Sequence, residues 1–385
     1  MSKKEDTNFE ELMEKLEEIT NKLEKEQLSL DESVKLFEEG MQISKQCNSK
    51  LEDAEKRITI LLNVNDLSMW SYIAQFAGEI CEASPSKFLD KIDKSKDNEE
   101  FISLFQQGDN SFTARHYYTH ILWVMECLLR TREYASRTVH ILMYLTTKIQ
   151  ACPISNSPAE VLSVFFCTWT NIYSVSIDDK IKYAEIGIKN YDSMWDIIFD
   201  RINSRNSSIM VSRSTFDYRL SEDVTEVTYE DMYKQNLMYL KFLRENAFGD
   251  VSRWQKLIKL LGDVPNDIFE EMISELEEIS KNANDSEKET IKTKLRTEIY
   301  RHRYFCKSEW AMDEPRVARI EEMCKRIRFD KPVYDFLYLY HSEYDLPLYN
   351  PHPYDAGMSD ENKELRHQLL DEEFKRIKEE NIDIC

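Results

Sequence analysis

The chain has 385 residues and a formal net charge of −21, from 51 Lys or Arg and 72 Asp or Glu residues. Because proteins that hold nucleic-acid phosphates directly use basic surfaces, this acidity disfavours direct DNA binding. The 7 glycines and 9 prolines are too few for a turn-rich β architecture, and a hydrophobic fraction of 42% can build a substantial core, so the composition predicts an all-α protein.

The first predicted elements are two amphipathic helices within residues 9–62. In the first helix, apolar residues recur every three or four positions, which makes one stripe on its surface. These residues are Phe9, Leu12, Met13, Leu16, Ile19 and Leu23. Two S/T-x-x-E capping boxes, at Thr7 and Ser29, mark two helix starts. Because residues 26–30 leave only a short connection, the helices are predicted to form an antiparallel hairpin.

The second predicted helix carries a heptad seam, in which residues four and three positions apart lie on one face. The seam positions are Leu30, Val34, Phe37, Met41, Ser44, Asn48, Leu51, Glu55, Ile58 and Leu62. The residues through which we predict the two helices to pair are Leu16, Leu23, Val34 and Phe37. Part of the seam is then left open for a partner.

Gly40 lies inside this second helix, beside Phe37 and Met41. A glycine there costs about 1 kcal/mol relative to alanine. Close approach by another helix would explain its presence. The alternative is a tolerated surface glycine.

The run LSLDESVKLFEEGM at residues 28–41 is the most specific part of a match over residues 8–62. This region resembles the small subunit of exodeoxyribonuclease VII, and it makes up about the first sixth of the chain. The resemblance implies a non-catalytic helical hairpin, several copies of which coat the coiled-coil arm of a catalytic large subunit. That enzyme degrades single-stranded DNA to oligonucleotides, and its nuclease residues lie on the large subunit.

The apolar stripes and the resemblance together give a set of expected partner-binding residues. They are Phe9, Leu12, Leu16, Leu23, Leu30, Val34, Phe37, Gly40, Met41 and Leu51. The implied partner is the large subunit, with several copies of the hairpin for each large subunit. Single-stranded DNA would be reached only through that complex. We expect no catalytic residue, no cofactor and no metal in the chain itself.

A short polar break at residues 63–67 separates the hairpin from the rest of the chain, so we predict two domains, 1–63 and 68–385. Residues 91–100 read as a charged connector, and long loops are expected near 203–227 and 344–357. Segments of helical length fill most of the remainder: 69–83, 116–130, 137–149, 158–173, 177–190, 193–202, 229–246, 253–261, 267–282, 286–305, 313–328, 331–341 and a charged terminal helix at 360–381. Repeated helix pairs of this length predict an α-solenoid of the HEAT type, although no clean sequence period supports it.

A second resemblance covers residues 70–354. Its runs PAEVLSVFFCTWTNIYSVSIDDKIKYAEIGI, SMWDIIFDRINSRNSSIMVSRSTFDYR and IYRHRYFCKSEWAMDEPRVARIEEMCKRI are similar to the helical-repeat region of large bacterial STAND-type NTPases of antiphage defence. In such proteins the repeats sense a partner. This sequence has no G-x-x-x-x-G-K-[ST] loop, so the alternative function is an interaction scaffold or sensor fragment without its NTPase.

Two groups of residues have a spacing that could support chemistry. His116 and His120 are four apart, as in two imidazoles that share a metal, but no glutamate lies between them, so packing or surface roles are favoured. Arg296 and the Arg-His-Arg run at 301–303, with Trp310 nearby, could contact phosphate. In so acidic a chain, a solvated helix face with salt bridges to Glu289 or Glu298 is the favoured interpretation.

Three arginines of the expected loop, Arg205, Arg213 and Arg219, could hold an anionic group, although ordering the loop against acidic helices is favoured. The eight cysteines form no C-x-x-C pair and lie mostly in apolar helical segments, so we expect them to be reduced and buried. No apolar run approaches the ~20 residues that span a bilayer, and the N-terminus is charged, so a cytoplasmic protein is expected.

Overall fold

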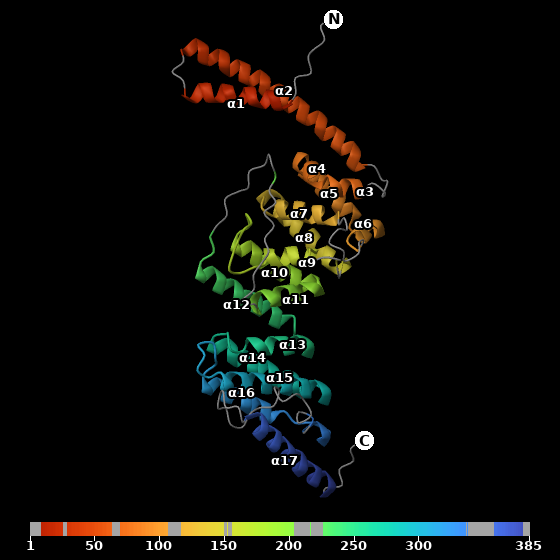
Figure 1. Ribbon diagram of the computed structural model, residues 1–385, viewed down its shortest axis with the longest axis vertical. Helices are drawn as coiled ribbons and strands as arrows, with labels where there is room; N and C mark the ends of the chain where they lie inside the picture. The colour runs from red at the N-terminus through yellow and green to blue at the C-terminus, as the bar shows by residue number, and fades with distance from the viewer. Residues whose placement is uncertain are drawn as a thin grey trace. The chain divides into compact units, whose positions relative to one another are not determined.

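The computed structural model describes residues 9–25, 29–63, 70–106, 117–149, 152, 156–203, 216, 226–335, 337 and 358–379. Every regular element within these residues is a helix, which confirms the all-α prediction (Figure 1). The chain divides into two compact units, Met1–Tyr239 and Leu240–Cys385. The predicted domain boundary near residues 63–68 and the solenoid arrangement both stay predictions.

The chain begins with the predicted hairpin, formed by α1 (Phe9–Lys25) and α2 (Leu30–Asn63) (Figure 1). Ser29 caps α2, because its Oγ accepts a hydrogen bond from the Glu32 N–H at 3.4 Å while its own N–H donates to Glu32 Oε2 at 3.1 Å. This confirms the second predicted capping box. The first, at Thr7, lies outside the described residues.

The rest of the first unit consists of short helices whose apolar faces are buried. Their bounds are α3 (Trp70–Gln75), α4 (Ala77–Ala83), α5 (Pro85–Ser95), α6 (Glu99–Leu104), α7 (Tyr118–Leu129), α8 (Arg132–Lys148), α9 (Pro158–Phe165), α10 (Ile177–Asn190) and α11 (Asp192–Asn203). Consecutive helices pack together, α7 on α8, α8 on α9 and α10 on α11, so neighbouring helices in the sequence are neighbours in this unit.

Two sequence predictions for this unit are wrong. Residues 91–95 are the end of α5 and not a connector, because Phe88, Leu89 and Ile92 form a fully buried face that keeps the helix going. α9 ends at Phe165, where the prediction continued to residue 173. The buried Asn171 side chain bonds the backbone there, accepting from the Tyr173 N–H and donating to the Val175 carbonyl, which holds an apolar but non-helical segment.

α12 (Tyr229–Glu245) runs across the division between the units, and the second unit continues with further helical elements. They are α13 (Val251–Leu257), the 3₁₀ turn η2 (Ile258–Leu260), α14 (Asn266–Asn282), α15 (Asp285–Tyr304), α16 (Glu314–Arg326), the 3₁₀ turn η3 (Pro332–Asp335) and α17 (Met358–Glu379). α15 packs against α13, η2, α14 and α16, so even its charged residues are largely buried.

Among the described glycines of the second unit, Gly262 leaves the least room for a Cβ atom. A Cβ atom there would lie 3.0 Å from His302 Cε1 and 3.3 Å from Met312 Cγ. We expect Gly262→Ala to lower the free energy of unfolding by about 1–3 kcal/mol, as overpacking of a core does. Urea denaturation followed by circular dichroism measures this change.

Gly78→Ala is the matched control, because Gly78 lies within α4 and a Cβ atom there would have no neighbouring atom within 4 Å. Alanine is the better helix former, so this variant should be as stable as the wild type or more stable by up to about 1 kcal/mol. Equal effects of the two substitutions would contradict the close contact at His302.

Candidate partner interface

The two hairpin helices pair through a small apolar core. Its buried residues are Leu12, Ile19, Ile43 and Cys47, and Phe9, Leu16 and Leu36 pack against it. Of the four residues predicted to pair the helices, only Leu16 belongs to this core, so the predicted pairing is wrong for Val34 and Phe37, and Leu23 lies at the margin with 36% of its surface exposed.

The physical reason is a rotation of α2 by one residue relative to the predicted seam. The α2 positions that face α1 are 36, 40, 43 and 47. The prediction placed positions 37, 41, 44 and 48 on that face. The difference of one residue corresponds to a rotation of about 100° around the helix axis. Gly40 lies on this facing side, and a Cβ atom there would be 3.4 Å from Ile19 Cγ2. That distance is an ordinary van der Waals contact, so an alanine would fit at this position and the approach of α1 does not by itself require a glycine.

The rotation leaves a second apolar face of α2 without a partner in the hairpin. Its exposed residues are Val34 (49%), Phe37 (61%), Met41 (49%) and Leu51 (51%), which we call the α2 stripe. At about 100° per residue these four positions fall within an arc of about 100°, beside the face that contacts α1. Such an arc is the width of an apolar face that packs against another element.

Two polar residues, Ser44 and Asn48, lie in the same arc between Met41 and Leu51. The α2 stripe therefore has an apolar first half, a polar centre and an apolar residue beyond it. A polar residue within an apolar helix seam costs stability but fixes the register and the choice of partner. The pattern fits a specific helical partner better than a general apolar surface.

The remaining predicted partner-binding residues differ in accessibility. Leu12 is buried in the hairpin core, and Phe9 and Leu16 are half-buried beside it. The Leu30 side chain is outside what the structure describes. On α1, Met13 is 45% exposed, although it was not among the expected contacts. Partner binding by these residues stays a prediction.

The structure does not test the histidine pair as a metal centre, because only one of its two members is described. His120 is exposed and its ring lies 5.2 Å from that of Trp123, while His116 is outside the described residues. Among the residues that the structure describes, no three His, Cys, Asp or Glu side chains gather as a metal ion would require. Arg205, Arg213 and Arg219 also lie outside the described part of the chain.

The basic cluster of α15 is paired with acidic residues. Arg296 Nη1 lies 3.7 Å from Glu289 Oε1, and Arg301 Nη1 lies 3.6 Å from Glu298 Oε2. This confirms the predicted salt bridges. The expected solvated face is wrong, because Arg296 is only 7% exposed on a helix with neighbours on several sides.

The next two residues of the cluster are also engaged. His302 is buried, and its Nδ1 accepts a hydrogen bond from the Met312 N–H at 2.9 Å. Arg303 pairs with Glu314 at 2.7 Å and with Glu321 at 2.6 Å. These contacts position α15 against the segment that follows it, and they occupy the basic groups of this cluster that could have met a phosphate.

The seven described cysteines are free thiols, and all but Cys152 and Cys306 are buried. Burial raises the pKa of Cys127 and of Cys152 to about 11, so both are thiols and not nucleophilic thiolates at neutral pH. In the part of the chain that is described, no helix has the length and apolarity to span a membrane.

Sequence reasoning did not predict the burial of Lys180. This residue is fully buried on α10, although a lysine side chain is ordinarily exposed. The signal was available, since Lys180 shares a helix face with Ala184 and Gly187, four and seven positions further on, and both are buried. A lysine on an apolar face is ordinarily taken as a boundary residue whose amine reaches solvent.

Comparison with known proteins identifies the hairpin. The family described as exonuclease VII small subunit matches residues 9–60. The exodeoxyribonuclease 7 small subunit of Alkaliphilus oremlandii is 48% identical over 62 residues, 16% of this chain and 80% of the relative. That of a Thermoanaerobacter species is 50% identical over 62 residues, 16% of this chain and 83% of the relative. The small subunit of Geobacter metallireducens is 48% identical over 58 residues, which are 15% of this chain and 76% of the relative. No solved structure matches the chain.

Proposed function

Because the chain belongs to the exonuclease VII small-subunit family through residues 9–60, we propose that it is a non-catalytic accessory subunit that binds the exonuclease VII large subunit. The α2 stripe is the proposed contact surface. The observation that carries this proposal is that the apolar residues of the α2 stripe are exposed, while the other apolar face of α2 is packed against α1.

A coiled-coil arm is a suitable partner for such a stripe, because it presents apolar seams along a helix of similar width. Several hairpins could then line one arm side by side. Single-stranded DNA would be handled by the large subunit, and the complex would act in the cytoplasm. In this assignment the present chain contributes stability and assembly, and it contributes no reacting group.

The test is co-expression of the full chain with an exonuclease VII large subunit, followed by size-exclusion chromatography with light scattering. We expect one complex that contains more than one copy of this chain for each large subunit. Separate elution of the two proteins at micromolar concentration would contradict the proposal.

The purified chain alone is expected to have no nuclease activity on single-stranded DNA, with or without Mg²⁺. Its net charge of −21 is unfavourable for holding a strand, whose phosphates bind to basic surfaces. A fluorescently labelled oligonucleotide resolved on a denaturing gel measures this. Cleavage that disappears when an Asp or Glu within residues 68–385 is substituted would show that the chain is itself a nuclease.

An interaction scaffold is the second candidate function, and the size of the chain beyond the family match favours it. The second unit has its own core, with Leu257, Met272, Leu295 and Ile320 fully buried, which a small-subunit hairpin does not require. In this assignment residues 68–385 form a helical-repeat domain that binds a protein partner. The hairpin would then tether that domain to the nuclease.

Limited proteolysis separates the two proposals. If residues 1–63 and 68–385 are separate domains, cleavage should occur between residues 63 and 68 and release a stable larger fragment. The accessory-subunit proposal requires residues 1–63 alone to bind the large subunit. The scaffold proposal requires the larger fragment to bind its partner without them. A chain that resists cleavage at the junction would argue against two domains.

A further inference from the structure

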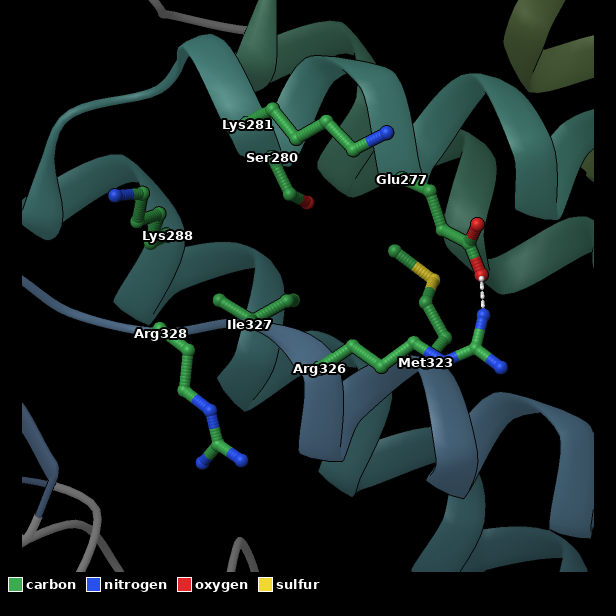
Figure 2. Close-up of a pocket in the computed structure, with 8 residues that line it drawn as sticks. All are labelled: Glu277, Ser280, Lys281, Lys288, Met323, Arg326, Ile327 and Arg328. Atoms are coloured by element: carbon green, nitrogen blue, oxygen red, sulfur yellow. Dashed lines mark hydrogen bonds and ion pairs between the residues drawn. The ribbon is translucent and has the colours of Figure 1, made fainter.

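The second unit contains a basic cavity that lies outside the hairpin and the α2 stripe. It has a volume of about 330 Å³ and is bounded by the end of α14, the start of α15 and the end of α16 with the two residues that follow it (Figure 2). Cavities that hold small molecules begin at about this size. The site is therefore large enough for a small ligand and too small for a polymer.

The lining of the cavity is cationic although the chain is strongly acidic. Four of its side chains are basic, Lys281, Lys288, Arg326 and Arg328, and one, Glu277, is acidic. Glu277 is already paired, since its Oε1 accepts from Arg319 Nη1 at 3.1 Å and from Arg326 Nη1 at 3.2 Å. Arg326 also pairs with Glu322, so the positive charge that remains comes from Lys281 and Arg328, for which no ion pair is seen among the described residues.

Helix ends explain only part of this charge. Lys281 and Arg326 lie in the last turns of α14 and α16, where a cation stabilises the helix dipole. Lys288 lies in the first turns of α15, where a cation is unfavourable, and it is only 9% exposed. Its Nζ forms an ion pair with Asp285 Oδ1 at 4.0 Å, which offsets that cost. Arg328 follows α16 and is exposed, and no carboxylate among the described residues pairs with it. Arg328 therefore needs a different reason.

Ser280 supplies an independent observation. It is 6% exposed, and its Oγ is buried without a hydrogen-bond partner among the described residues. Figure 2 shows this hydroxyl pointing into the space that the labelled side chains enclose. A buried hydroxyl with no partner is unfavourable, so a ligand that accepts a hydrogen bond from it would be stabilised there.

We propose that this cavity binds a small phosphate-bearing molecule. The phosphate oxygens accept a hydrogen bond from Ser280 Oγ, and the basic side chains of the lining, Lys281 and Arg328 among them, supply the compensating positive charge. Met323 and Ile327 give the cavity an apolar wall for the remainder of the ligand. The inference is independent of the proposed function, because the hairpin belongs to the other unit.

Isothermal titration of the full chain with inorganic pyrophosphate tests the proposal. The wild type should bind, and Arg328→Gln should bind at least about tenfold more weakly, as expected for loss of a positive charge at the phosphate. Ser280→Ala should weaken binding while its thermal unfolding temperature without ligand stays the same or rises, because the removed hydroxyl has no partner to lose.

Lys307→Gln is the control, since Lys307 is exposed, lies outside the cavity and changes the net charge equally. It should bind pyrophosphate like the wild type. No binding by the wild type at about 10 mM pyrophosphate would overturn the proposal, as would an equal loss in Lys307→Gln and Arg328→Gln. If Ser280→Ala proves unstable, the exposed Arg328 still decides the outcome, because its removal takes nothing from the core.

Discussion

Lys180→Met is expected to stabilise the chain substantially at neutral and acidic pH. Lys180 is fully buried, and its Nζ has no hydrogen-bond partner among the described residues. Burial lowers the pKa of this amine to about 7. The rings of Phe165 and Tyr173, whose centroids lie 5.5 and 5.9 Å from Nζ, offset only part of the cost of burying the ammonium.

The stabilisation should depend on pH in a defined direction. The pKa of an unfolded lysine is about 10.4, so between about pH 7 and pH 10 the unfolded chain binds a proton that the folded chain does not. Wild-type stability should therefore rise with pH across this window. Methionine removes the ionisable group, so the advantage of Lys180→Met should be greatest below about pH 7, at a few kcal/mol, and should fade toward about pH 10.

Urea denaturation of both proteins across that pH range measures the difference. Lys182→Met is the control, because Lys182 is an exposed lysine two positions away that pairs with Asp179 at 3.0 Å. Its effect should be small and should not grow as the pH falls. A Lys180→Met variant that is less stable than the wild type at every pH would mean that the buried amine has a favourable structural role.

Phe37→Ala is expected to weaken binding to the exonuclease VII large subunit by about 100-fold or more. If Phe37 becomes fully buried in the complex, its loss costs about 3–5 kcal/mol, and each 1.4 kcal/mol is about a tenfold change in affinity. The hairpin itself should fold normally, because 61% of the Phe37 surface is exposed in the chain alone. Titration against the immobilised large subunit measures the affinity, and circular dichroism checks the fold.

Two matched variants complete this experiment. Glu39→Ala changes an exposed residue on the opposite side of α2 and should bind like the wild type. Ile43→Ala removes a buried residue of the hairpin core and should lower helical stability as well as binding. Unchanged co-purification of Phe37→Ala with the large subunit would count decisively against the α2 stripe.

The hairpin shows how far apolar spacing can be interpreted. The sequence contains two apolar stripes on α2, one through Leu36 and Ile43 and one through Val34 and Phe37, and both have helical spacing. Spacing alone predicts that both are helical faces. Which one faces α1 is seen only in the core that Ile43 and Cys47 form with Leu12 and Ile19, a tertiary contact between two helices that local periodicity cannot contain.

Helix bounds were predicted best where a capping residue marks the start. α10 begins and ends at the predicted residues, because Ser176 accepts a hydrogen bond from the Asp179 N–H at 3.1 Å. α9 was overextended because Phe166 and Cys167 are apolar and buried but not helical. Apolar side chains predict burial, but a buried segment can be a turn as well as a helix.

The basic cavity could not have been predicted from the sequence. Its residues come from three helices, and Ser280 and Arg328 are 48 positions apart, so no motif joins them. The expected anion-binding candidates, Arg301 and Arg303, turned out to be neutralised by Glu298 and Glu314. The pair of Arg301 with Glu298 lies within α15 and is accessible to sequence reasoning, whereas the pairs of Arg303 with Glu314 and Glu321 join two helices and appear only in the fold.

A site-specific cross-link tests the central claim most directly. A photoreactive phenylalanine analogue at position 37, within the α2 stripe, should cross-link to the large subunit in the assembled complex. The same analogue at Gln46, which is exposed on the opposite side of α2, should not. Cross-linking from position 46 and none from position 37 would contradict binding through the α2 stripe.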